Sequence, residues 1–201
     1  MIRRILTALV AIPILVGAIW VGFPWLTILV GAAAFLGLLE FYRMAPGPVP
    51  RVLWSLGALW TLLFVAAGQL TAHWYDYAPH ILLGAGLILA LPWLIIIGIS
   101  HNRRGKAFAA WVYALVGPLY VGFLLSHALM LRELDSGADH SRNWLLFALL
   151  VTFATDTGAI FTGRAIGRHR MSPSISPNKT WEGAIGGFTW AVSVALVLGA
   201  L

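Results

Sequence analysis

Residues 156–183, DTGAIFTGRAIGRHRMSPSISPNKTWEG, connect two apolar runs of the chain through a basic, proline-containing loop. The first run carries an acidic residue, Asp156, and the second run begins at Ala184. Pro173 and Pro177 prevent a continuous helix through the loop, because proline lacks the N–H that an interior helical position must donate. Two apolar helices joined by a short polar loop are typical of a protein that crosses a membrane more than once.

The composition of the whole chain supports this interpretation. Hydrophobic residues make up 60% and charged residues 10% of the 201 residues, and the mean hydropathy is +0.88. No stretch combines enough polar surface with enough length to enclose a water-soluble core. We therefore expect an all-α, polytopic bundle of transmembrane helices, in which residues 1–201 form a single membrane-embedded domain.

Apolar segments long enough to cross a bilayer recur along the chain. From length and hydropathy we predict about seven spans. They cover approximately residues 5–21, 25–42, 52–70, 81–99, 108–130, 144–161 and 183 to the end of the chain.

The chain contains no cysteine and six scattered histidines. The absence of cysteine excludes disulfides, thiolate zinc sites and cysteine nucleophiles. The histidines show no HExxH or paired spacing, so we do not expect a metal site built from histidine.

The distribution of basic residues predicts the orientation of the chain. If alternate loops lie on opposite sides of the membrane, all but two of the 13 lysines and arginines fall on one side, the exceptions being Arg132 and Arg142. Because cytoplasmic loops carry the excess of basic residues, we expect the amino terminus and the loop around Lys179 in the cytoplasm. The net charge of +6 then indicates contact with anionic lipid headgroups, and no nucleic-acid partner is expected.

Asp156 is an acidic residue inside an apolar run. A carboxylate at membrane depth is costly, so such a residue usually serves a function and faces the bundle interior. At helical spacing it shares one face with Thr152 and Gly163. Two interpretations are open: Asp156 binds a metal ion or substrate, or it forms a structural ion pair with Arg164.

Basic residues follow at the end of this run. Arg164 is a candidate phosphate ligand, because a guanidinium group binds phosphate oxygens bidentately. For Arg168 and Arg170, the ordinary excess of basic residues in cytoplasmic loops is an equally good explanation. The glycines here do not form a Walker A loop, because the G-x-x-x-x-G-K-[ST] pattern is absent.

The residues that lead into the last apolar run predict an anion site at the start of a helix. Thr180 or Ser176 is expected to cap this helix, with Glu182 in its first turn. Free backbone N–H groups, the charge of Lys179 and hydrogen bonds from Asn178 and Thr180 would hold phosphate. The alternative is a capped helix with a snorkelling lysine, in which Glu182 only complements the helix dipole. Close packing against a neighbouring helix is expected at Gly183, Gly186 and Gly187.

Taken together, these motifs resemble the phosphatidate cytidylyltransferase family, membrane enzymes that make CDP-diacylglycerol from phosphatidate and CTP. The shared pattern is D-[ST]-G-A, then G-R/K-x-x-G-R/K-x-[RK], then S-P-x-K-T-x-E-G, which occurs here in that order. The resemblance is dense over residues 156–187 and weaker over the earlier spans, including residues 39–44. The family's later signature, with Ser, Lys-Arg, Lys-Asp, His-Gly-Gly and Asp-Arg-x-Asp elements, does not occur in the 201 residues. We therefore expect this chain to be the amino-terminal portion of a longer enzyme.

The resemblance implies a nucleotidyl transfer in phospholipid biosynthesis, assisted by Mg²⁺. It implies catalytic roles for Lys179 and Asp156, with Asp156 linked to the metal and the main metal ligands expected in a carboxyl-terminal part. The substrate-binding and phosphate-binding residues that it implies are Ser176, Asn178, Lys179, Thr180, Arg164 and Glu182.

The resemblance also implies partners and a location. The partners are phosphatidate, CTP, membrane lipids and a second copy in a homodimer, and the location is a bacterial-type cytoplasmic membrane with the site facing the cytoplasm. Two other hypotheses stay open. The chain is a noncatalytic remnant or split subunit of such an enzyme, or it is a small-solute transporter in which Asp156 is the coupling residue.

Overall fold

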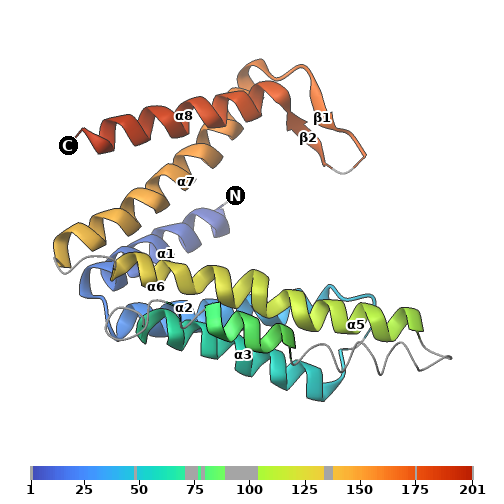
Figure 1. The fold of residues 1–201 in the computed structure, drawn as a ribbon. Helices are drawn as coiled ribbons and strands as arrows, with labels where there is room; N and C mark the ends of the chain where they lie inside the picture. The colour runs from blue at the N-terminus through green and yellow to red at the C-terminus, as the bar shows by residue number, and fades with distance from the viewer. Residues whose placement is uncertain are drawn as a thin grey trace. The chain divides into compact units, whose positions relative to one another are not determined.

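The computed structural model describes residues 2–47, 49–70, 77, 80–88, 104–133, 138–174 and 176–200. Packing divides the chain into an amino-terminal unit, Met1–Arg142, and a carboxyl-terminal unit, Asn143–Leu201. The regular secondary structure of the described residues is helical apart from one two-stranded hairpin (Figure 1). This confirms the prediction of an all-α, polytopic membrane bundle.

Most helices belong to the amino-terminal unit. They are α1 (Ile2–Val21), α2 (Trp25–Arg43), α3 (Arg51–Leu70), a short helix over residues 80–88, α5 (Arg104–Gly117), the π-helix η1 (Pro118–Phe123) and α6 (Leu124–Arg132). The last three follow one another without interruption. Helix α7 (Ala138–Ile166) begins in this unit and continues through the carboxyl-terminal unit.

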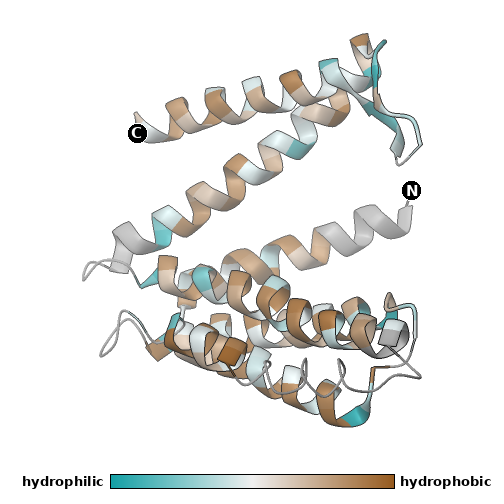
Figure 2. Ribbon diagram, turned by 45° about the vertical axis from the view of Figure 1, so that its right-hand side comes forward, coloured by the Kyte–Doolittle hydropathy of each residue, from teal (hydrophilic) through white to brown (hydrophobic). Residues whose placement is uncertain are grey.

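Five described helical segments are long and apolar enough to cross a membrane. They are Trp25–Arg43, Arg51–Leu70, Phe108–Arg132, Arg142–Ile166 and Trp181–Gly199, and a shorter apolar helix covers Leu9–Val21. Residues 89–99 of the predicted fourth span lie outside the described residues. Hydrophobic residues dominate the helices, whereas hydrophilic residues gather at helix ends and on the hairpin (Figure 2). The number of about seven spans and the cytoplasmic amino terminus stay predictions.

The core of the amino-terminal unit forms where α2 and α3 pack against each other and against η1 and α6. The buried residues of α2 recur at every fourth position, which places them on one stripe of the helix. They are Leu26, Val30, Ala34, Leu38 and Tyr42.

Tyr42, the last residue of this stripe, supplies a hydrogen bond that α5 lacks where it meets Pro118. Pro118 has no N–H, so the carbonyl of Ala114 one turn earlier loses its helical donor. The buried hydroxyl of Tyr42 donates to that carbonyl oxygen at 3.2 Å. Gly57 of α3 makes this approach possible, because a Cβ there would clash with the Tyr42 hydroxyl.

Removing the hydroxyl in Tyr42→Phe should lower the free energy of unfolding by about 1–3 kcal/mol, because a buried carbonyl would be left without a donor. Thermal unfolding of the detergent-solubilised protein measures this loss. Tyr120→Phe is the matched control, since the Tyr120 side chain is 63% exposed. Equal stability of the two variants would contradict the role assigned to Tyr42.

Arg132 and Arg142 both contact the end of α1. They are the two basic residues that were predicted from sequence to lie on the opposite side of the membrane from the others. Arg132 is 8% exposed, and its Nε donates to the carbonyl oxygen of Ile19 at 3.0 Å. Ile19 lies in the last turn of α1, where carbonyls lack helical donors and favour positive charge. The guanidinium of Arg142 lies over the Trp20 ring, 4.2 Å from its centroid. Both arginines therefore have a structural use in this unit.

The carboxyl-terminal unit consists of two helices joined through a hairpin. After α7 come β1 (Arg170–Ser172), β2 (Ser176–Thr180) and α8 (Trp181–Gly199). The strands pair antiparallel, with Arg170 opposite Thr180 and Ser172 opposite Ser176, and the register shifts between these pairs. The hairpin was not predicted from sequence.

Glycines bring α7 and α8 into close contact. A Cβ at Gly183 would lie 3.0 Å from the carbonyl oxygen of Ala159, and one at Gly187 would lie 2.8 Å from that of Thr155. A Cβ at Gly186 would clash with Thr162. The prediction that Gly183, Gly186 and Gly187 permit close helix packing is confirmed.

Candidate functional site

The second and third of the family-like motifs meet at the junction of α7, the hairpin and α8. Thr180 ends β2 in an extended conformation, and its Oγ1 accepts a hydrogen bond from the N–H of Gly183 at 3.2 Å. The cap is therefore Thr180, one of the two predicted residues. The other, Ser176, lies half-buried at the start of β2.

Thr180 also contacts the glycines of the second motif. A Cβ at Gly163 would lie 3.2 Å from Thr180 Oγ1, and one at Gly167 would lie 2.7 Å from it. Gly167 closes the end of α7 by donating its N–H to the carbonyl oxygen of Gly163 at 3.1 Å. These glycines thus leave room for the threonine that starts α8.

Glu182 binds the loop that precedes β1. Its carboxylate oxygens accept hydrogen bonds from the backbone N–H groups of Arg168 and His169, each at 3.2 Å. The Nδ1 of His169 lies 2.5 Å from Oε1 of Glu182, so this nitrogen is the donor to the carboxylate. In the opposite direction, the N–H of Trp181 donates to the carbonyl oxygen of His169 at 2.9 Å.

These bonds correct one expectation about the start of α8. The N–H groups of Trp181 and Gly183 already bond to His169 and Thr180. The expectation that this helix start offers free backbone donors to phosphate is therefore wrong for these two groups.

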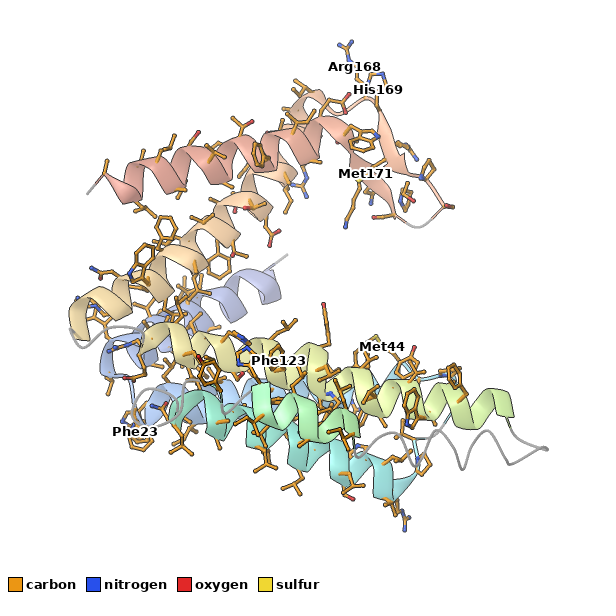
Figure 3. The ribbon with its side chains drawn as sticks, viewed as in Figure 1. Phe23, Met44, Phe123, Arg168, His169 and Met171 are labelled. Carbon is orange, nitrogen blue, oxygen red and sulfur yellow. The ribbon has the colours of Figure 1, made fainter. Side chains whose placement is uncertain are left out.

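The cationic side chains of the junction are exposed. They are Arg164 in the last turn of α7, Arg168 in the loop, Arg170 on β1 and Lys179 on β2. Asn178, also exposed, precedes Lys179. Figure 3 shows Arg168 pointing outward from the loop, beside His169. Within the described ranges, none of these four cations forms an ion pair, and the nearby carboxylate of Glu182 is paired with His169.

Asp156 is not part of this cluster. It is exposed within its unit and lies eight residues before Arg164, a rise of about 12 Å along a helix. Among the residues that the structure describes, Asp156 and Arg164 do not form the ion pair considered as the structural alternative. The described part of the chain also holds no group of three or more side chains suited to bind a metal ion.

Sequence reasoning missed the role of His169. The histidine and Glu182 are 13 residues apart, on either side of a hairpin whose strands are only three and five residues long. No helical or strand period relates the two positions. The signal that was available is the pair of prolines: Pro173 lies in the turn of the hairpin, and Pro177 is the second residue of β2.

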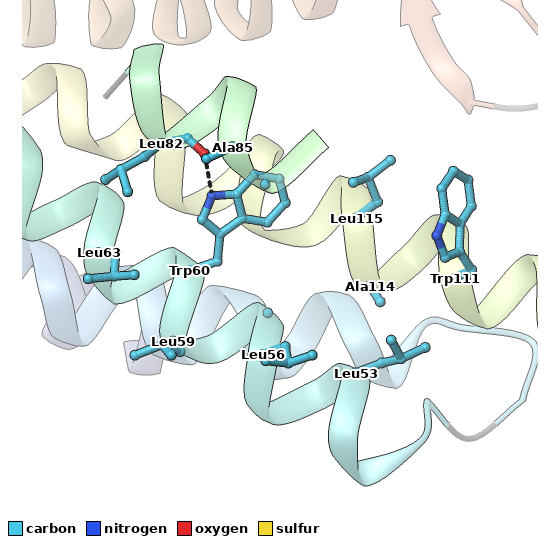
Figure 4. Close-up of a pocket in the computed structure, with 12 residues that line it drawn as sticks. Leu53, Leu56, Leu59, Trp60, Leu63, Leu82, Ala85, Trp111, Ala114 and Leu115 are labelled. Atoms are coloured by element: carbon cyan, nitrogen blue, oxygen red, sulfur yellow. Dashed lines mark hydrogen bonds between the residues drawn. The ribbon is translucent and has the colours of Figure 1, made fainter. Parts of the chain in front are cut away.

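A separate pocket in the amino-terminal unit is lined, within the part of the chain that the structure describes, by no charged side chains. It has a volume of about 230 Å³ and lies between α3, the helix over residues 80–88 and α5 (Figure 4). The Nε1 of Trp60 is bonded across it to the carbonyl oxygen of Leu82 at 3.0 Å. The lining is aliphatic and aromatic, so the pocket suits hydrocarbon and not a nucleotide.

Comparison with known proteins agrees with the motifs. Residues 2–201 match the sequence profile described as "Cytidylyltransferase family". The chain is 27% identical to a phosphatidate cytidylyltransferase of Haemophilus influenzae, over 97% of this chain and 71% of the relative. It is 31% identical to enzymes of that name from Staphylococcus saprophyticus and Brucella suis, over 97% and 98% of this chain and 70% and 67% of the relatives. The chain belongs to the cytidylyltransferase family.

Proposed function

We propose that this chain acts as a phosphatidate cytidylyltransferase, which converts CTP and phosphatidate to CDP-diacylglycerol and pyrophosphate. The observation that carries the proposal is the meeting of the second and third motifs at one junction with exposed cations. Membership of the family and the names of its relatives support the same substrates. An apolar helix bundle also suits a substrate that keeps its acyl chains in a bilayer.

In the proposed reaction, a phosphate oxygen of phosphatidate attacks the α-phosphorus of CTP. A new P–O bond forms, the bond between the α-phosphorus and the bridging oxygen breaks, and pyrophosphate leaves with the electron pair. This type of transfer depends on positioning and on neutralising phosphate charge. We assign charge neutralisation to Lys179 and Arg164, with hydrogen bonds from Asn178.

Thr180, Ser176 and Glu182 take a different part in the proposed site. Thr180 Oγ1 and the Glu182 carboxylate already accept hydrogen bonds from backbone N–H groups within the junction. We therefore propose that these two side chains mainly hold the site in shape, and that contact with phosphate is not their main role. Ser176, at the other end of β2, stays a proposed substrate ligand.

Mg²⁺ is the proposed cofactor, as the resemblance implies. It binds proteins through one or two carboxylates together with substrate phosphates and water. Asp156, whose carboxylate has no ion-pair partner among the described residues, fits one such ligand position. The described side chains do not build a complete site. Bound Mg²⁺ would offset negative charge on the phosphates.

The proposed location is a bacterial cytoplasmic membrane with the junction on the cytoplasmic side, where CTP is dissolved. The excess of basic residues at this junction supports the orientation. A homodimer is part of the same proposal. A noncatalytic subunit would contain the same fold, and only an assay of the reaction separates it from an enzyme.

The test uses the purified chain in phosphatidylcholine vesicles that contain phosphatidate. With CTP labelled on the α-phosphate, we expect label to enter the lipid fraction only when phosphatidate is present. Pyrophosphate should be released in equal amount. Absence of lipid label would favour the noncatalytic subunit, and solute flux without CTP would favour a transporter.

A further inference from the structure

We propose that Glu182 and His169 form a clamp that positions the hairpin and its cations, and that Glu182 does not itself bind phosphate. The clamp consists of the Glu182 carboxylate, the His169 imidazole and the backbone N–H groups of Arg168 and His169. This inference rests on the proposed function, because it assigns a positioning role within that site.

The clamp fixes the first strand of the hairpin to the first turn of α8. Helix α7 ends at Ile166, and β1 begins at Arg170 after a short loop. Glu182 accepts the N–H groups of the last two loop residues, and Trp181 donates back to the loop at His169. Because Thr180 at the end of β2 caps α8, both strands of the hairpin are connected to the first turn of α8.

The clamp also determines the charge that the junction presents. Glu182 is the acidic residue closest in sequence to Lys179, and a free carboxylate there would compete with phosphate for the lysine. Its oxygens instead accept N–H groups of the loop. Arg164, Arg168, Arg170 and Lys179 are therefore left without an acidic partner among the described residues.

The exposure of the two side chains indicates whether the clamp stabilises the whole fold or only the hairpin. The side chains of His169 and Glu182 are 81% and 21% exposed. An ion pair that reaches solvent contributes little to global stability, because water screens it. Its loss should therefore free the hairpin locally without unfolding α7 and α8.

Two measurements on the vesicle-reconstituted protein test the clamp. The first is the rate of trypsin cleavage after Arg168, Arg170 and Lys179, which reports the opening of the hairpin. The second is kcat and KM for CTP. Glu182→Gln keeps the shape of the side chain but removes its charge, and Glu133→Gln is the matched control at the end of α6.

For Glu182→Gln we expect cleavage in the hairpin to rise about tenfold. We also expect kcat to fall roughly 10- to 100-fold, because cationic side chains that are out of place no longer position the reacting phosphates. His169→Ala should have a smaller effect, since both backbone bonds to Glu182 remain. The double variant should match Glu182→Gln, because the two side chains share one interaction. Glu133→Gln should leave both measurements unchanged.

Two results would overturn the inference. One is lost activity in Glu182→Gln with hairpin cleavage as in the unaltered chain, which would show that Glu182 contacts substrate directly. The other is unchanged cleavage and unchanged activity. Cleavage is measured without CTP or phosphatidate, so it tests the clamp even if the unaltered chain makes no CDP-diacylglycerol and the proposed function fails.

Discussion

Lys179→Ala is expected to reduce turnover of CTP by about 10²–10³-fold, the usual loss when one stabilising donor is removed from developing phosphate charge. Lys179 lies exposed on β2, one residue before the cap of α8. It has no ion-pair partner among the described residues, so its charge is available to a substrate. Replacing an exposed side chain of this kind should change stability by no more than about 0.5 kcal/mol.

The chain offers a matched control for this variant, because Lys106 is its other lysine. Lys106→Ala removes the same charge from helix α5, away from the hairpin in sequence, and should retain turnover. Lys179→Arg should recover part of the activity, since it restores the charge but not the compact ammonium group. Near-normal turnover of Lys179→Ala, with the protein still inserted in the membrane, would exclude the assigned role.

The second large effect is expected for Gly186→Ala, which should destabilise the packing of α7 on α8 by about 1–3 kcal/mol, as overpacking usually does. The added Cβ would overlap the side chain of Thr162. The helices cannot easily separate to relieve the overlap, because Gly183 and Gly187 already pack on the α7 backbone. Thermal unfolding in detergent measures the change.

Gly199→Ala is the control on the same helix. A Cβ at Gly199 would meet nothing within 4 Å. Both substitutions gain helix propensity, so a difference between them reports the contact with α7 and not the helix itself. If the two variants unfold at the same temperature, the close approach of α7 and α8 is not what the glycines provide.

The fold class followed from the sequence because hydropathy acts over whole segments. The apolar runs at residues 25–42 and 52–70 became α2 and α3 with ends shifted by one residue at most. The cap at Thr180 was also predictable, because a hydroxyl residue and the helix start it serves are neighbours in sequence. The small residues of α8 predicted close packing for the same local reason.

The hairpin and the clamp were not predictable in this way. Strands of three and five residues give too short a pattern for period-two alternation, and the register shifts within them. The pairing of His169 with Glu182 depends on that hairpin, so it appears in no local pattern. The sequence therefore did not indicate that the carboxylate of Glu182 is bonded to the loop before β1. The catalytic roles of Asp156 and Lys179 stay predictions.

The bond between Tyr42 and Ala114 makes two distant positions of the sequence interdependent. In a bilayer, no water is available to satisfy a carbonyl that a proline has released, so another helix must supply the donor. Alanine in place of Pro118 would restore an N–H for Ala114, and Tyr42→Phe should then cost little stability. A related chain without a proline at this position would not need the tyrosine as a donor. A substitution at residue 42 that is harmful in this chain would then be neutral in such a relative.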